Sequence, residues 1–108
     1  MKNSLLLSIC ICASTVIAAQ TPVDETQILT IGGIQQFVRI KGKDRSKPLL
    51  LFLHGGPGGS VMSYADKFTS RLQAHFIVVQ WDQRETGKTR QWNEPPVALT
   101  VSVFQQDT

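Results

Sequence analysis

The chain has 108 residues, of which 42% are hydrophobic and 18% are charged, and this is the size and balance of one small globular domain. Such a composition excludes collagen-like, low-complexity and long coiled-coil proteins. The 11 basic and 8 acidic residues give a formal net charge of +3. Because the basic residues are scattered singly instead of clustering, we expect no nucleic-acid partner.

Residues 1–19 are typical of a secretory signal peptide. Lys2 supplies a positive charge, residues 5–13 are almost continuously apolar, and residues 16–19 end in the small side chains that a signal peptidase prefers. The apolar run is shorter than the roughly 20 residues that a membrane span requires. We therefore expect a secreted or periplasmic protein that has no membrane contact after cleavage, with a flexible N-terminus at residues 20–26.

The sequence contains two cysteines, Cys10 and Cys12. Both lie within the predicted signal, so the mature chain would contain none. This excludes disulfides and thiolate metal sites from the mature protein.

The mature sequence begins with a predicted antiparallel hairpin. Residues 27–31 and 35–40 have the pattern of short strands, and the Gly32-Gly33 pair between them accepts the positive φ angles of a tight turn. After a charged surface loop at 41–47, residues 49–53 are all apolar. A strand without a polar face is typical of the middle of a sheet that is covered on both sides.

A helix and a second buried strand complete a predicted βαβ unit. Apolar residues recur at helical spacing over 61–72, with Ser60 placed as the N-cap and Asp66 on the solvated face. Residues 76–79 then form another buried-strand pattern. Strand, helix and strand in this order predict a parallel sheet and an α/β fold.

The last part of the chain is predicted to be a loop at 85–97 and the start of another helix, which Thr100 caps. Only one complete helix would then be available to cover the strand at 49–53. A parallel sheet needs helices on both faces. We therefore expect residues 27–108 to be the N-terminal part of a larger, incomplete domain, which would be poorly stable because its sheet has an unpaired edge.

A glycine-rich turn, residues 54–59, joins the predicted strand at 49–53 to the helix. Its glycines lack Cβ atoms, so the backbone can lie close to a ligand with its amide hydrogens directed at negative charge. Ligands of open α/β sheets bind at such carboxyl ends of strands. The turn fits an oxyanion hole or a phosphate cradle. The phosphate-loop motif fails at 87–89, because Asp82 stands where its leading glycine belongs.

The motif HGGPG at 54–58, directly after an apolar strand and followed about two dozen residues later by WDQR at 81–84, resembles the proline iminopeptidase branch of the α/β-hydrolase superfamily. The resemblance covers residues 27–108 and corresponds to the first four strands and the first helix of that fold. It implies that a backbone amide of Gly55 or Gly56 is one donor of an oxyanion hole, and it implies no cofactor or metal. It also implies structural roles near the site for His54, Pro57, Gly58, Asp82, Gln83 and Arg84.

The sequence departs from the family pattern in two respects. The family usually has glycine after the arginine of the second motif, where this chain has Glu85. The nucleophile elbow G-x-S-x-G of the superfamily does not occur in the 108 residues, because the segment 58–62 lacks the last glycine. Ser60 is therefore expected to be a helix cap and not a nucleophile. His54 and His75 precede any nucleophile, against the family order, so neither is expected in a catalytic triad.

The resemblance implies that the full-length parent is a secreted serine hydrolase acting on a small peptide or ester, in particular an aminopeptidase that releases N-terminal proline. This chain would contribute half of the oxyanion hole and no nucleophile, acid or base, so it is expected to be inactive alone. Two alternatives stay open: a non-catalytic secreted binding module on the same half-sheet, and a phosphate-binding protein that uses the glycine turn.

Overall fold

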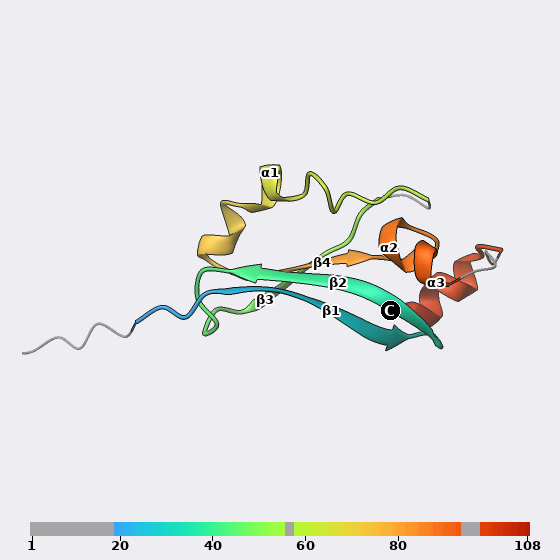
Figure 1. Cartoon of the computed structure of the whole chain (residues 1–108), viewed down its shortest axis with the longest axis horizontal. Coiled ribbons are helices and arrows are strands. Elements are labelled where there is room, and N and C mark those ends of the chain that lie inside the picture. Colours follow the sequence, from blue (N-terminus) through green and yellow to red (C-terminus); the bar gives the residue numbers. More distant parts are fainter. Residues whose placement is uncertain (1–18, 56–57, 94–97) are drawn as a thin grey trace, which may run out of the picture.

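Four strands form one mixed sheet in the order β1-β2-β4-β3. The computed structural model describes residues 19–55, 58–93 and 98–108, and Figure 1 shows the sheet with short helices around it. The predicted signal peptide lies almost wholly outside the described residues. The strands are β1 (Val23–Ile31), β2 (Ile34–Gly42), β3 (Leu49–Phe52) and β4 (Ile77–Asp82).

The predicted hairpin of β1 and β2 is confirmed. The two strands pair antiparallel over their whole length, and the turn residues Gly32 and Gly33 have φ angles of 57° and 79°, which is the left-handed pair that a two-residue turn requires. The strand begins at Val23, within the segment 20–26 that was expected to be a flexible N-terminus. This polar stretch has no strand pattern of its own, but its backbone pairs with the end of β2 and Val23 is only 4% exposed.

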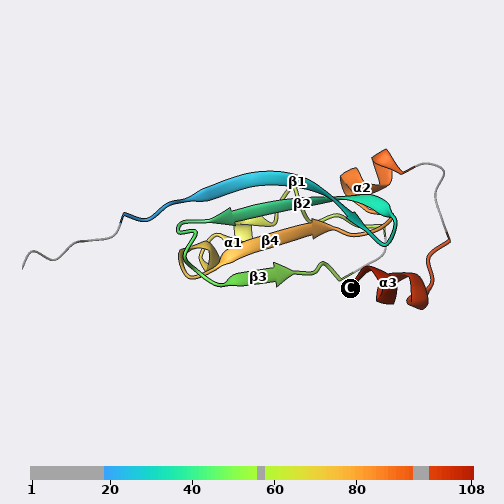
Figure 2. The ribbon, with the colours of Figure 1, turned by 90° about the horizontal axis from the view of Figure 1, so that it is seen from below.

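The predicted α/β character is also confirmed, because β3 and β4 are parallel neighbours. β4 lies between β2 and β3 and pairs antiparallel with β2 from Phe37↔Asp82 to Lys41↔Val78. Figure 2 shows the four strands side by side in this order. The sheet therefore combines an antiparallel hairpin with a parallel pair, and β4 extends three residues beyond the predicted end, to Asp82.

The prediction that the strand at 49–53 lies in the middle of a doubly covered sheet is wrong for the described chain. β3 is an edge strand, and Leu49, Leu51 and Leu53 remain 70%, 51% and 47% exposed. Only the other face of β3 is covered, where the Phe52 and Phe68 rings lie 5.1 Å apart between centroids. The apolar run identified the strand correctly but could not show which of its faces has a partner among the described residues.

The connection from β3 to β4 is less helical than predicted. It contains a four-residue helix, α1 (Asp66–Thr69), and a 3-10 turn, η1 (Leu72–Ala74). Ser60 does not cap a helix. Its hydroxyl accepts the Met62 backbone N–H at 3.1 Å and donates to the Asp82 carboxylate, so the chain is anchored to β4 before helical structure begins.

Charged side chains attach α1 to the sheet. Asp66, expected in solvent, pairs with Lys41 at 2.7 Å and with Arg39 at 3.4 Å. The hydrogen bond from Lys41, followed by the charge of Arg39, holds the pKa of Asp66 below its ordinary value. Beneath this pair, Gln80 of β4 donates to the hydroxyl of the fully buried Thr69 at 3.1 Å. These contacts position the segment that follows the glycine turn over one face of the sheet.

Two further helices flank the ends of β2 and β4. α2 (Gly87–Trp92) lies in the stretch predicted as a loop, of which residues 94–97 are outside the described chain. α3 (Val101–Asp107) forms as predicted, and the Thr100 hydroxyl accepts the Val103 N–H. Figures 1 and 2 both show α3 at the end of the sheet that carries the β1–β2 turn.

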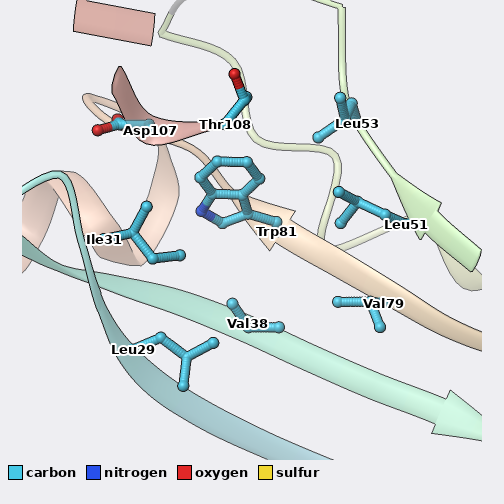
Figure 3. A pocket seen from close by; sticks show the side chains of 9 residues that line it. All are labelled: Leu29, Ile31, Val38, Leu51, Leu53, Val79, Trp81, Asp107 and Thr108. Atoms are coloured by element: carbon cyan, nitrogen blue, oxygen red, sulfur yellow. The ribbon is translucent and has the colours of Figure 1, made fainter. Parts of the chain in front are cut away.

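The face of the sheet opposite α1 is apolar and largely open. A cavity of about 300 Å³ lies over it, and Figure 3 shows Trp81 at its centre between Leu51, Val38 and the end of α3. The Trp81 ring is 6% exposed and donates its Nε1–H to Gln36 at 2.8 Å. None of the helices that the structure describes is long and apolar enough to cross a membrane.

Candidate functional site

The glycine turn begins at the carboxyl end of β3, beside the carboxyl end of β4. Gly55 is exposed and lies beyond the last paired residue of β3, Phe52, so its amide takes no part in the strand ladder. Gly58 is exposed and has a φ angle of 80°. Gly56 and Pro57 lie outside the described residues. The turn thus starts where a ligand of an α/β sheet is expected.

Asp82 organises the loop on the neighbouring strand. Its side chain, 2% exposed, accepts hydrogen bonds from the Ser60 hydroxyl and from the Lys88 backbone N–H, the latter at 3.0 Å. Its backbone carbonyl accepts the Thr89 hydroxyl, which in turn accepts the Phe37 N–H at 2.9 Å. Asp82 therefore fixes the chain after the glycine turn and the start of α2, and through Thr89 it is connected to Phe37 of β2.

Asp82 and Lys88 also line a cavity of about 340 Å³. Ser60 lies at the same cavity, and its hydroxyl proton is directed to the Asp82 carboxylate. A serine nucleophile needs a base, most often histidine, to take its proton. The hydroxyl of Ser60 donates to the Asp82 carboxylate and not to a histidine, so Ser60 anchors the chain to β4. The same carboxylate also accepts the Lys88 N–H, which agrees with the structural role expected of Asp82.

His54 joins the glycine turn to the loop after β4. The imidazole is 7% exposed, and its Nε2 accepts the Gln83 backbone N–H at 3.4 Å. The Thr86 hydroxyl lies 3.3 Å from the same nitrogen and donates to the Gln83 carbonyl at 2.6 Å. His54 and Gln83 are thus brought together, whereas His75 is exposed at the C-terminal end of η1.

Arg84 is the centre of a buried charged cluster. Its guanidinium donates to both carboxylate oxygens of Asp107, at 3.0 and 2.8 Å, and to the Gly32 carbonyl at 2.8 Å. Gln36 donates to the same carboxylate at 3.0 Å. The hydrogen bonds that Arg84 donates to the Asp107 carboxylate raise the pKa of Arg84 above its ordinary value. Arg84 therefore connects the hairpin turn, the β4 loop and the end of α3.

Asp107 and Gln36 of this cluster were not predicted from the sequence. Asp107 is separated from Arg84 by 23 positions and Gln36 from Asp107 by 71. Neither residue belongs to a local motif, so only the folded sheet brings them together. Among the described residues, no group of three His, Cys, Asp or Glu side chains is placed to hold a metal ion.

Glu85 occupies the position where the resemblance favoured glycine, and its φ angle is 60°. It is the only non-glycine residue with a positive φ among those described. Left-handed backbone costs an ordinary L-residue roughly 1–2 kcal/mol. The side chain is 8% exposed and its carboxylate lies 4.0 Å from Arg90. The loop thus keeps the shape of a glycine loop at the expense of local strain.

Replacing Glu85 with asparagine is expected to stabilise the chain, because asparagine adopts left-handed backbone more readily than glutamate. We expect a gain of about 0.5–1 kcal/mol in the free energy of unfolding. This is less than the full strain, because the loss of the glutamate side-chain contacts offsets part of the gain. Glu85→Ala is the matched control, since it removes the side chain and keeps the strain. Urea unfolding followed by circular dichroism measures both, and an asparagine variant no more stable than the alanine variant would contradict the assignment of strain.

The sequence of the chain is similar to that of a protein named as a probable aminopeptidase. The chain is 40% identical over 80 residues to a probable aminopeptidase, YbaC, of Bacillus subtilis (strain 168). The match covers 74% of this chain and 25% of the relative, so the chain spans about a quarter of the length of the curated relative it matches. No family model and no solved structure matches the chain.

Proposed function

We propose that this chain is the N-terminal part of a secreted serine hydrolase of the α/β-hydrolase superfamily, and that the parent is an aminopeptidase similar to the proline iminopeptidases. The similarity to a probable aminopeptidase carries the reaction class. The mixed sheet and the position of the glycine turn at the carboxyl end of β3 support the fold-level part of the proposal. The proposed substrate is a small peptide or ester.

The proposed role of the turn is to stabilise charge on the substrate. When serine attacks a peptide carbonyl, the carbonyl oxygen becomes an oxyanion, and backbone N–H groups that are already oriented lower the barrier. The amide of Gly55 or Gly56 would be one such donor. The nucleophile, acid and base would come from the remainder of the parent protein, since the 108 residues hold no G-x-S-x-G motif.

Proline substitution in the full-length parent tests this role, because proline has no backbone N–H. We expect Gly55→Pro or Gly56→Pro to lower kcat for a prolyl arylamide by about 10²–10³-fold, the usual effect of losing one oxyanion donor. Gly55→Ala is the control, since it keeps the N–H and no atom lies within 4 Å of the added Cβ. Near-normal kcat in both proline variants would overturn the assignment.

The isolated 108-residue chain gives a second test. It is expected to show no turnover of prolyl arylamides or simple esters and no labelling at Ser60 by a fluorophosphonate, because the Ser60 hydroxyl donates to Asp82. Turnover that is lost in Ser60→Ala would contradict the proposal that the nucleophile lies elsewhere.

A further inference from the structure

The surroundings of the buried His54 imidazole differ between its two ring nitrogens, and this difference favours one position for the ring proton. His54 is 7% exposed, so solvent has little access to the ring nitrogens, and each of them depends on the protein for hydrogen-bond partners. Nε2 faces the Gln83 N–H at 3.4 Å and the Thr86 hydroxyl at 3.3 Å. Nδ1 is buried and has no hydrogen-bond partner among the described residues.

The partners of Nε2 decide where the proton lies. A backbone N–H can only donate, so Nε2 must be unprotonated to accept it. The Thr86 hydroxyl donates its proton to the Gln83 carbonyl at 2.6 Å, so toward Nε2 it can act only as an acceptor, and the Gln83 N–H is the partner that requires Nε2 to be unprotonated. Neutral imidazole carries one ring proton, and with Nε2 acting as an acceptor that proton belongs to Nδ1.

Counting the unsatisfied groups gives the same answer. With the proton on Nδ1, only the Nδ1–H lacks a partner among the described residues. With the proton on Nε2, the ring could donate to the Thr86 hydroxyl, but two groups, Nδ1 and the Gln83 N–H, would then lack a partner among the described residues. The doubly protonated ring leaves the Gln83 N–H unpaired as well and adds a buried charge, which costs more still.

We propose that His54 is a neutral imidazole protonated on Nδ1, and that it is a positioning residue which holds the loop after β4 against the start of the glycine turn. Its Nε2 fixes the Gln83 amide, and Thr86 closes the same loop onto the Gln83 carbonyl. The link to catalysis rests on the proposed function, because the turn that His54 begins is the proposed oxyanion donor. The position of the ring proton can be tested on the 108-residue chain alone. The same holds for the hydrogen bonds that His54 and Thr86 make with Gln83, which we call the clamp.

Nitrogen NMR of the chain labelled with ¹⁵N-histidine tests the tautomer directly. We expect the protonated type of resonance for Nδ1 of His54 and the unprotonated type for Nε2 at neutral pH. His75 is exposed and serves as an internal control that averages both tautomers in solvent. A proton found on Nε2, or on both nitrogens, would overturn the proposal.

Two variants test the clamp. The glutamine side chain of His54→Gln can place an oxygen near the position of Nε2, whereas the shorter side chain of His54→Asn reaches only the position of Nδ1. Hydrogen exchange at the Gln83 amide is expected to become about three- to tenfold faster in His54→Asn, the effect of losing one net hydrogen bond, and to change less than twofold in His54→Gln. Equal acceleration in both variants would count against the clamp. If the asparagine variant fails to fold, the tautomer measured on the wild-type chain still decides the proposal.

The catalytic consequence is measured in the full-length parent. We expect His54→Asn to lower kcat with little change in KM, and His54→Gln to recover most of that loss. A parent that hydrolyses no peptide or ester would refute the proposed function, while the NMR and exchange results would still support or overturn the clamp. The two failures are therefore distinguishable.

Discussion

Replacing Arg84 with alanine is expected to lower the free energy of unfolding by about 3–5 kcal/mol, the usual loss when one partner of a buried ion pair is removed. The Asp107 carboxylate would remain buried with Gln36 as its one remaining donor among the described residues, and the Gly32 carbonyl would lose the hydrogen bond from Arg84. A small domain has a total stability of only about 5–15 kcal/mol. Much of the chain would then unfold at moderate urea concentration, as measured by circular dichroism.

Arg45→Ala is the matched control for this prediction. Arg45 lies 3.4 Å from Glu25, but their side chains are 53% and 40% exposed, and such pairs contribute about 0–1 kcal/mol. The double variant Arg84→Met/Asp107→Leu removes both buried charges and should lose less than Arg84→Ala alone. Equal effects of Arg84→Ala and Arg45→Ala would show that the buried cluster contributes no more than a surface pair.

Gly87→Ala is expected to be the second most damaging single change, with a loss of about 2–4 kcal/mol that combines left-handed strain and displaced buried hydrogen bonds. The φ angle of Gly87 is 46°, and an added Cβ would lie 2.2 Å from the Asp82 carboxylate. That carboxylate holds both the Ser60 hydroxyl and the Lys88 N–H. Displacing it would therefore loosen the start of α2 and the chain after the glycine turn together.

Gly33→Ala separates strain from collision. Gly33 has a φ angle of 79° and no atom within 4 Å of an added Cβ, so this variant should lose only the roughly 1–2 kcal/mol of left-handed strain. In an Asp82→Ala background the collision is gone, and Gly87→Ala should then cost about as much as Gly33→Ala. A cost for Gly87→Ala that does not depend on residue 82 would contradict the role assigned to the carboxylate.

The parts of the fold that are encoded locally could be predicted from the sequence. The hairpin follows from two short strands on either side of Gly32-Gly33, because the turn demands positive φ angles that glycine supplies. The parallel pair follows from two apolar runs separated by a connection long enough to cross over. The Thr100 cap of α3 needs only neighbouring residues.

The parts that depend on distant contacts could not be predicted. α2 was missed because its first turn is held by Asp82 of the preceding strand, and Thr86 makes no side-chain cap. The position of β3 at the edge follows from which strand pairs with β4, which the apolar run itself does not encode.

The candidate site was predictable to a similar extent. Motif spacing placed the glycine turn and the loop of Asp82 and Arg84 together. That Glu85, where the family usually has glycine, adopts left-handed backbone is a finding of the structure. The buried cluster was not predictable as a whole, because Asp107 lies in no motif and reaches Arg84 only through the folded sheet.

The strand order has a consequence for synthesis of the protein on the ribosome. β1 and β2 are contiguous and can pair as soon as both have emerged, whereas β3 pairs with β4, which is completed about 30 residues later. At about 5–20 residues per second, β3 would wait for roughly 1.5–6 s. During that interval the nascent chain carries an extended apolar segment at residues 49–53 with no partner strand yet made. That segment is where we expect a ribosome-associated chaperone to bind.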